Sequence, residues 1–315
     1  MNGCLNLLPD WLRAFIENSG AVYSADHVRV MFNLENNHQD NLKYLGTYFP
    51  RSFIEIKSIC MEIDRLTSHF TFFEEKKSFK LLSVGCGTGG DIAGLVCFLH
   101  ARYPEAEFEI NVIDGNEDAL NICRDIFKQM HEATGIRIII KRGSKNIRST
   151  SDFYNLAYNF SDMDFIVTSK FLCELLTRCD NVYYHFAKAF SASLSERGMM
   201  IISDVTCTAA NGTFIPLCMN SDLNDFTDAS EFSFVLPVTC RNHKHCKNHS
   251  CYTKFQHPDT NSKYNYRVLV RDSVARSILP EQTAEHLISL NEEIRCAQVS
   301  KDDNDDKIEL DFGLL

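Results

Sequence analysis

The residues with the clearest chemical potential in this 315-residue chain are three glycines that follow an apolar run. Gly85, Gly87 and Gly89 come directly after Lys80-Leu81-Leu82-Ser83-Val84 and lead into a segment with helical spacing. Glycine has no Cβ, so its backbone can approach a bound group closely, and the N-terminus of a helix offers free N–H groups. The pattern therefore predicts a strand, a glycine loop and a helix that together bind a nucleotide-like cofactor.

A second apolar run, residues 108–113, ends in Asp114. An acid at the end of the second strand is suited to bind ribose hydroxyls. Gly85, Gly87 and Gly90 also match the dinucleotide pattern G-x-G-x-x-G, which is weak evidence alone. Asp114 lies 24 residues after Gly90, farther than the roughly 20 residues typical of an NAD site. The spacing disfavours NAD, and an NAD-dependent oxidoreductase stays as an alternative.

The run Leu-Leu-Ser-Val-Gly-Cys-Gly-Thr-Gly resembles motif I of the class I S-adenosylmethionine (SAM)-dependent methyltransferases, and Asp114 falls where that family binds the ribose. The resemblance covers residues 80 to about 205. Ser83 departs from it, because many members carry an acid two residues before the first glycine. The implied fold is α/β, a seven-stranded doubly wound Rossmann-like methyltransferase sheet, and the implied cofactor is SAM. The resemblance assigns these residues to the cofactor: Gly85, Cys86, Gly87, Gly89, Asp91, Asp114, Gly115 and Ser169.

Alternating strand and helix patterns predict the elements that position these residues. In the resembled family the last strand is antiparallel and lies between the fifth and sixth strands, so the sixth strand ends on the cofactor edge of the sheet. We expect strands near residues 80–84, 108–113, 136–141, 164–168, 199–204, 232–237 and 265–270.

Three regions are expected along the chain. Residues 1–76 form a helical N-terminal region, which covers the cofactor, shapes the substrate entrance or packs on the sheet. Residues 77–275 form the methyltransferase domain, with a Cys/His-rich insertion at 238–263. Residues 276–315 form a C-terminal segment with an acidic, mobile tail.

The insertion contains Cys240, Cys246 and Cys251 among several histidines. Thiolate and imidazole ligands at this density suit zinc or an iron–sulfur cluster. The spacing differs from the usual C-x2-C zinc pattern, so a polar loop with incidental cysteines stays as an alternative. The fourth ligand is open between a nearby histidine and the distant Cys296.

A narrower resemblance links the insertion to the ribosomal small-subunit methyltransferase-like family, on the order of Pro237, Cys240, Cys246, Cys251 and Phe255. Mitochondrial members of that family act in assembly of the small ribosomal subunit and hold an iron–sulfur cluster on four cysteines. The resemblance implies a 4Fe-4S cluster on Cys240, Cys246 and Cys251, with Cys296 as a fourth ligand, and RNA or a ribosomal subunit as partner. It also raises a second class of function, a non-catalytic SAM-binding assembly factor.

The acceptor of a methyl group is not identified by any motif. An Asn/Asp-Pro-Pro-Tyr motif, which indicates transfer to a planar amine, is absent after the fourth strand, where Thr168-Ser169-Lys170-Phe171 stands instead. Lys170 and Glu174 are the candidate catalytic residues. Methyl transfer needs mainly alignment of donor and nucleophile and removal of a proton, so few catalytic side chains are required.

Composition limits the class of protein. Hydrophobic content of 44% and charged content of 23% are those of an ordinary soluble globular protein. We find no apolar run near the roughly 18 residues of a membrane span and no targeting signal, so we expect a cytoplasmic protein without membrane contact. The formal charge of −10 disfavours an extensive phosphate-binding surface, although local basic patches remain.

Overall fold

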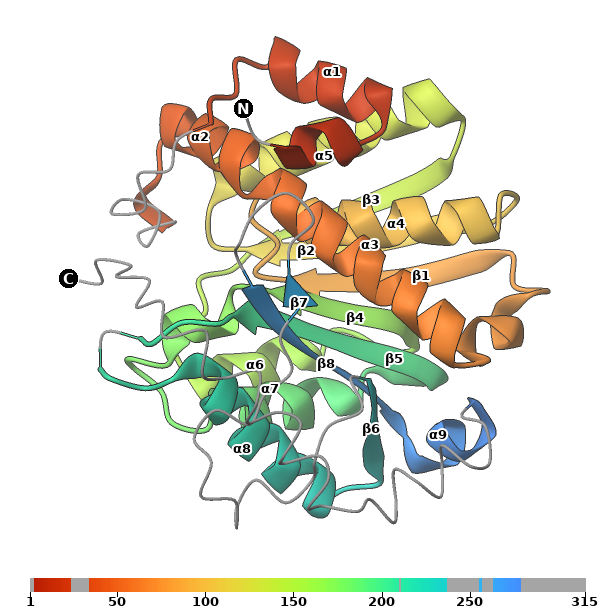
Figure 1. The fold of residues 1–315 in the computed structure, drawn as a ribbon, viewed down its shortest axis with the longest axis vertical. Helices are drawn as coiled ribbons and strands as arrows, with labels where there is room; N and C mark the ends of the chain where they lie inside the picture. Colours follow the sequence, from red (N-terminus) through yellow and green to blue (C-terminus); the bar gives the residue numbers. More distant parts are fainter. Residues whose placement is uncertain (1–2, 24–33, 210, 237–254, 257–262, 279–315) are drawn as a thin grey trace.

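The computed structural model describes residues 3–23, 34–209, 211–236, 255–256 and 263–278. A mixed β-sheet forms its centre, with helices on both faces (Figure 1). The strands in this part of the chain are β1 (Ser78–Val84), β2 (Glu107–Asp114), β3 (Arg137–Ser144), β4 (Met163–Ser169), β5 (Leu194–Val205), β6 (Phe232–Leu236), β7 (Phe255–Gln256) and β8 (Lys263–Arg271).

The strand order is β3-β2-β1-β4-β5-β8-β6, with the two-residue β7 paired to β8. The first five strands are parallel, whereas β8 is antiparallel to both of its neighbours, β5 and β6. This is the order that the resemblance to class I methyltransferases implies, and the expected α/β fold is confirmed. Because β6 runs parallel to β5, it ends at the same edge of the sheet as the glycine loop.

Helices of the first half of the chain cover one face of the sheet (Figure 1). Alternate residues of each strand point to opposite faces, so Leu81 packs with these helices while Leu82 packs on the other side. The helical elements of this face are η1 (Gly3–Leu7), α1 (Asp10–Asn18), α2 (His38–Thr47), α3 (Phe49–Leu66), η3 (His69–Phe73), α4 (Gly90–Arg102) and α5 (Glu117–Thr134).

The second face carries helices from the middle of the chain. They are α6 (Thr150–Ala157), η4 (Leu172–Leu175), α7 (Val182–Ser191) and α8 (Ile215–Asp228). The last helix of the described residues, α9 (Asp272–Ile278), lies beside β6 and β8, and its buried side chains join the core of the first face. None of the helices in the described ranges is long and apolar enough to cross a membrane.

The N-terminal region is helical, as predicted, and packs directly on the sheet domain. Pro50 stands in the first turn of α3, where its missing N–H costs nothing. Helix α3 crosses α4 so closely that a Cβ at Gly94 would overlap the carbonyl oxygen of Phe53. The absence of a side chain at Gly94 therefore sets the distance between the N-terminal helices and the glycine loop, from which α4 begins.

We expect Gly94→Ala to destabilise the protein. Alanine is favoured over glycine within a helix by roughly 1 kcal/mol, but here the added methyl group must push α3 away, and overpacking costs about 1–3 kcal/mol. Denaturant unfolding should show a net loss of stability. Ala101→Gly, at an exposed position of the same helix, is the control for helix propensity alone. A Gly94→Ala protein more stable than its parent would contradict the close contact of α3 with α4.

Candidate cofactor site

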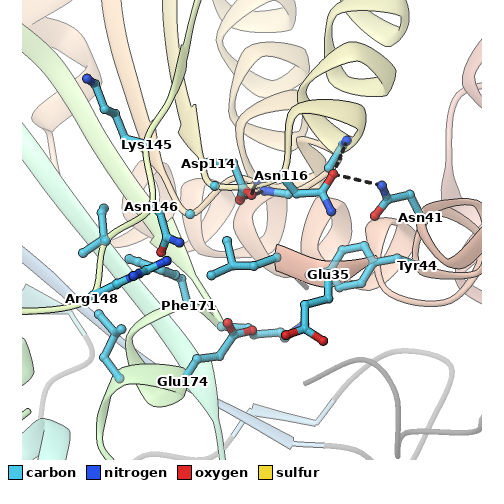
Figure 2. Close-up of a pocket in the computed structure, with 18 of the residues that line it drawn as sticks. Glu35, Asn41, Tyr44, Asp114, Asn116, Lys145, Asn146, Arg148, Phe171 and Glu174 are labelled. Atoms are coloured by element: carbon cyan, nitrogen blue, oxygen red, sulfur yellow. Dashed lines mark hydrogen bonds between the residues drawn. The ribbon is translucent and has the colours of Figure 1, made fainter. Parts of the chain in front are cut away.

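A cavity of about 520 Å³ lies at the edge of the sheet where β1, β2 and β4 end (Figure 2). It is lined by residues of the glycine loop, the β2 exit, the β3 exit, the β4 exit and the N-terminal region. They are Leu34, Glu35, Asn41, Tyr44, Gly85, Gly87, Asp114, Gly115, Asn116, Ala119, Lys145, Asn146, Ile147, Arg148, Lys170, Phe171, Glu174, Leu175 and Arg178.

The glycine loop turns sharply between β1 and α4. Gly85, Gly87 and Gly89 have φ angles of +71°, +51° and +87°, a region in which only glycine is comfortable. A Cβ at Gly85 would collide with the ring of Phe171, which lines the cavity. Gly89 has a second constraint, because a Cβ there would meet the sulfur of Cys123 on α5. The loop therefore exposes its backbone, and side chains at Gly85 and Gly89 would collide with their neighbours.

Asp114 reaches from the end of β2 to this loop. Its Oδ2 accepts the backbone N–H of Gly87 at 2.7 Å, and its Oδ1 accepts that of Asn116 at 2.8 Å. Burial raises the pKa of Asp114 above its ordinary value, although these backbone hydrogen bonds oppose the shift. A carboxylate has about four acceptor positions, so each oxygen can also accept a hydroxyl from the cavity.

Asp91 is buried behind the loop and does not line the cavity. Its Oδ2 accepts the hydroxyl of Ser83 at 2.7 Å, and its Oδ1 accepts the backbone N–H of Ile92 at 2.7 Å. Ser83 occupies the position where the resembled family often carries an acid. The Ser83 hydroxyl instead donates to an acid in the first turn of α4, eight residues later in the chain.

Burial raises the pKa of Asp91 to about 7, far above the ordinary 3.8. Between these two values the folded state holds a proton that the unfolded state has lost, so stability falls as pH rises from about 4 to 7 and is level above that. A pKa higher by about three in the folded state corresponds to a change of up to about 4 kcal/mol in the free energy of unfolding.

We expect Asp91→Asn, which mimics the protonated acid, to gain stability relative to the parent protein as the pH rises from about 4 to 7. Urea unfolding of both proteins at several pH values measures the difference, and parallel curves would contradict a buried, proton-holding Asp91.

The N-terminal region supplies one wall of the cavity. Tyr44 of α2 lies beside the glycine loop, where a Cβ added at Gly87 would come into van der Waals contact with its ring, and its ring centroid is 5.1 Å from that of Tyr48. Burial, helped by the charges of Glu174 and Asp114, raises the pKa of Tyr44 well above its ordinary value. The N-terminal region thus both packs on the sheet domain and lines the cavity.

Asn41 ties α2 to the start of α5. Its side-chain amide donates to Asn116 Oδ1 at 3.1 Å (Figure 2). The same amide donates to Asp118 Oδ2 at 2.8 Å. Asn116 in turn caps α5 by accepting the N–H of Ala119 at 3.0 Å. These contacts fix the segment directly after Asp114, which forms the floor of the cavity.

Lys170 lies where β4 ends, in the left-handed backbone region with φ of +59°. Its N–H donates to the carbonyl of Ser203 on β5 at 2.9 Å, which holds this strained residue in place. Its ammonium lies 2.6 Å from Glu55 of α3. Glu174, one turn further on, is half-buried and lines the same cavity.

The predicted cofactor residues divide into two groups. Gly85, Gly87, Asp114 and Gly115 line the cavity together with both catalytic candidates, Lys170 and Glu174. The others are buried beside it without lining it, namely Cys86, Gly89, Asp91 and Ser169.

Five further residues at the site were not predicted from the sequence: Tyr44, Asn41, Asn116, Phe171 and Glu55. Asn116 and Phe171 closely follow predicted strand ends, which is the signal that could have found them. Glu55 carried none, because its acid is one of several on a helix with an ordinary amphipathic pattern.

The predicted metal ligands Cys240, Cys246, Cys251 and Cys296 lie outside the described residues. Within the described ranges, no three His, Cys, Asp or Glu side chains are grouped closely enough to hold a metal ion. The metal site therefore stays a prediction from the sequence.

No family model matches the chain, and no curated protein matches it. Among solved structures, a loganic acid methyltransferase with SAH is 12% identical, covers 75% of this chain and 97% of its own, and has a TM-score of 0.47. SAH-bound Podospora anserina methyltransferase PaMTH1 is 13% identical, with coverages of 84% and 88% and a TM-score of 0.39. TrmN from Thermus thermophilus is 13% identical, with coverages of 72% and 53% and a TM-score of 0.38. Because these scores are low, the fold assignment rests on the strand order of this chain.

Proposed function

We propose that this protein is a SAM-dependent methyltransferase. The observation that carries the proposal is one cavity that joins a side-chain-free glycine loop, a carboxylate at the β2 exit and polar groups at the β4 exit. Ligands of open α/β sheets bind in this position, outside the carboxyl ends of the strands. Asp114 has acceptor positions for the two ribose hydroxyls, and the glycine loop leaves room for the 5′ side of a nucleoside.

The residues of the cavity fit the remaining parts of SAM. Leu34 and the buried Ile147 offer an apolar wall for the base near the β3 exit. SAM, when bound, supplies an electrophilic methyl group on a sulfonium sulfur. The chain has then to hold donor and acceptor in line and to exclude water. Phe171 beside Gly85 and Tyr44 beside Gly87 both line the cavity, and we propose that their rings exclude water from the bound donor.

The acceptor is proposed to be anionic. Lys145, Arg148 and Arg178 are exposed and line the cavity together with one exposed acid, Glu35, so the exposed lining carries a net positive charge. RNA, suggested by the narrower family resemblance, is the anionic acceptor that we propose for the first test. Glu174 and Glu35, whose carboxylates lie in the same cavity (Figure 2), are the candidate proton acceptors.

Transfer of a labelled methyl group from SAM tests this proposal. The protein is incubated with labelled SAM and separately with RNA, protein and small-molecule fractions, and Gly85→Ala serves as the inactive control. We expect label in the RNA fraction only. Binding of SAH without transfer to any fraction would favour the second function, a non-catalytic SAM-binding assembly factor. Thermal protection by NAD but not by SAH would favour the oxidoreductase.

We also propose the metal or iron–sulfur site on Cys240, Cys246, Cys251 and Cys296. Its support is ligand density in the sequence and the end of β6 at Leu236, on the edge of the sheet that carries the cavity. We expect anaerobically purified protein to contain stoichiometric zinc or iron and Cys246→Ser to lose it, with lower stability because metal binding is coupled to folding. Elemental analysis measures both, and metal-free protein with thiols that react freely would contradict the site.

A further inference from the structure

An ion pair joins the N-terminal region to the wall of the cavity. Lys170 Nζ lies 2.6 Å from Glu55 Oε2, and the two side chains are only 13% and 4% exposed. Ser52, one turn before Glu55 on α3, places its hydroxyl 3.5 Å from the same ammonium. An ion pair so far removed from water has a large desolvation penalty and is weak evidence for stability alone. Its position at the cavity indicates a binding role.

The order of the strands gives the direction of a bound nucleoside. Asp114, the glycine loop and Lys170 lie at the ends of β2, β1 and β4, which are neighbours in the sheet. With about 4.8 Å between strands, Asp114 and Lys170 stand roughly 10 Å apart along the edge. When Asp114 binds the ribose hydroxyls, the base and the 5′ arm extend to opposite sides. The apolar Leu34 and Ile147 are on the β3 side, so the 5′ arm runs over the glycine loop toward β4.

The ammonium of Lys170 has capacity for a further partner. A lysine has three N–H donors, of which Glu55 takes one and Ser52 holds another at a long distance. Lys170 also lines the cavity. A charged hydrogen bond in a site shielded from water is stronger than one in solvent. The group best suited to the free donor is a carboxylate at the end of the 5′ arm.

We propose that Lys170, positioned by Glu55, binds the α-carboxylate of the amino-acid end of SAM and SAH. The inference rests on the proposed function and assigns Lys170 to the donor, where the sequence analysis considered it a catalytic residue. Glu55 acts as a positioning residue, because its carboxylate fixes the direction of the ammonium from behind. Helix α3 thereby couples the N-terminal region to cofactor recognition.

Two ligands that differ in the amino-acid end test the proposal. SAH carries the α-carboxylate, whereas 5′-methylthioadenosine has the same nucleoside and sulfur without it. Calorimetry of the full chain should give a loss of SAH affinity of about 10- to 100-fold for Lys170→Met, the range of a charged hydrogen bond. The affinity for 5′-methylthioadenosine should be unchanged. Glu55→Gln should show the same selectivity with a smaller loss, and Lys43→Met, on the exposed side of α2, should change neither affinity.

Each single variant leaves one charge buried without its partner, which can itself destabilise the protein. The double variant Glu55→Gln/Lys170→Met is therefore measured as well, because it removes both charges together. It should retain the parent affinity for 5′-methylthioadenosine and show the loss for SAH. Equal losses for both ligands would assign the pair a structural role and overturn the inference, as would unchanged affinity for SAH. Failure of the parent protein to bind either ligand would instead overturn the proposed function, and the inference with it.

Discussion

Gly85→Ala should abolish measurable binding of SAH. The alanine must adopt a φ of +71°, which costs roughly 1–2 kcal/mol in a chain of L-residues. Its methyl group also collides with Phe171, so the loop or the ring must move into the space of the ligand. We expect the SAH affinity to fall by at least about 100-fold, since overpacking adds about 1–3 kcal/mol. Calorimetry on folded protein measures the effect.

Gly212→Ala is the matched control for this substitution. Gly212 has a φ of +81°, but nothing lies within 4 Å of a Cβ there. The control therefore carries the backbone strain without the collision, and it is outside the cavity. We expect slightly lower stability and unchanged SAH affinity. A Gly85→Ala protein that binds SAH within a few-fold of the parent would remove the glycine loop from the site.

Asp114→Ala should weaken SAH binding by about 10- to 100-fold, the scale of one or two hydrogen bonds to a charged acceptor. The same carboxylate also holds the N–H groups of Gly87 and Asn116, so some loss can arise from the loop alone. The 2′-deoxy analogue of SAH separates the two effects, because it lacks one ribose hydroxyl. It should bind the parent more weakly than SAH, and Asp114→Ala should largely remove this difference. Equal discrimination by parent and variant would contradict the contact with ribose.

Much of the sheet could be predicted from the sequence, because its signals are local. The apolar run at residues 108–113 predicted β2, which the structure extends by one residue at each end. The fifth strand was predicted at residues 199–204 but begins at Leu194. Its first residues include Ser195 and Glu196, whose polarity concealed the pairing of Leu194 with Met163.

The details of the site were harder to predict, because they depend on contacts between distant segments. The glycine loop and Asp114 belong to local motifs, and the structure brings them together in one cavity. Glu55 and Lys170 are separated by 115 positions, and only the folded chain brings α3 next to the end of β4. Asp91 was expected at the cofactor, yet helix α4 turns its carboxyl toward Ser83 inside the protein. Side-chain direction of this kind follows from the packing of whole elements, which the motif does not encode.

Isothermal titration of the full chain with SAH, and separately with NAD, tests most directly whether the cavity binds the SAM family of nucleosides. We expect saturable binding of one SAH per chain and no measurable binding of NAD. Binding of NAD in place of SAH, or binding of neither, would contradict this expectation.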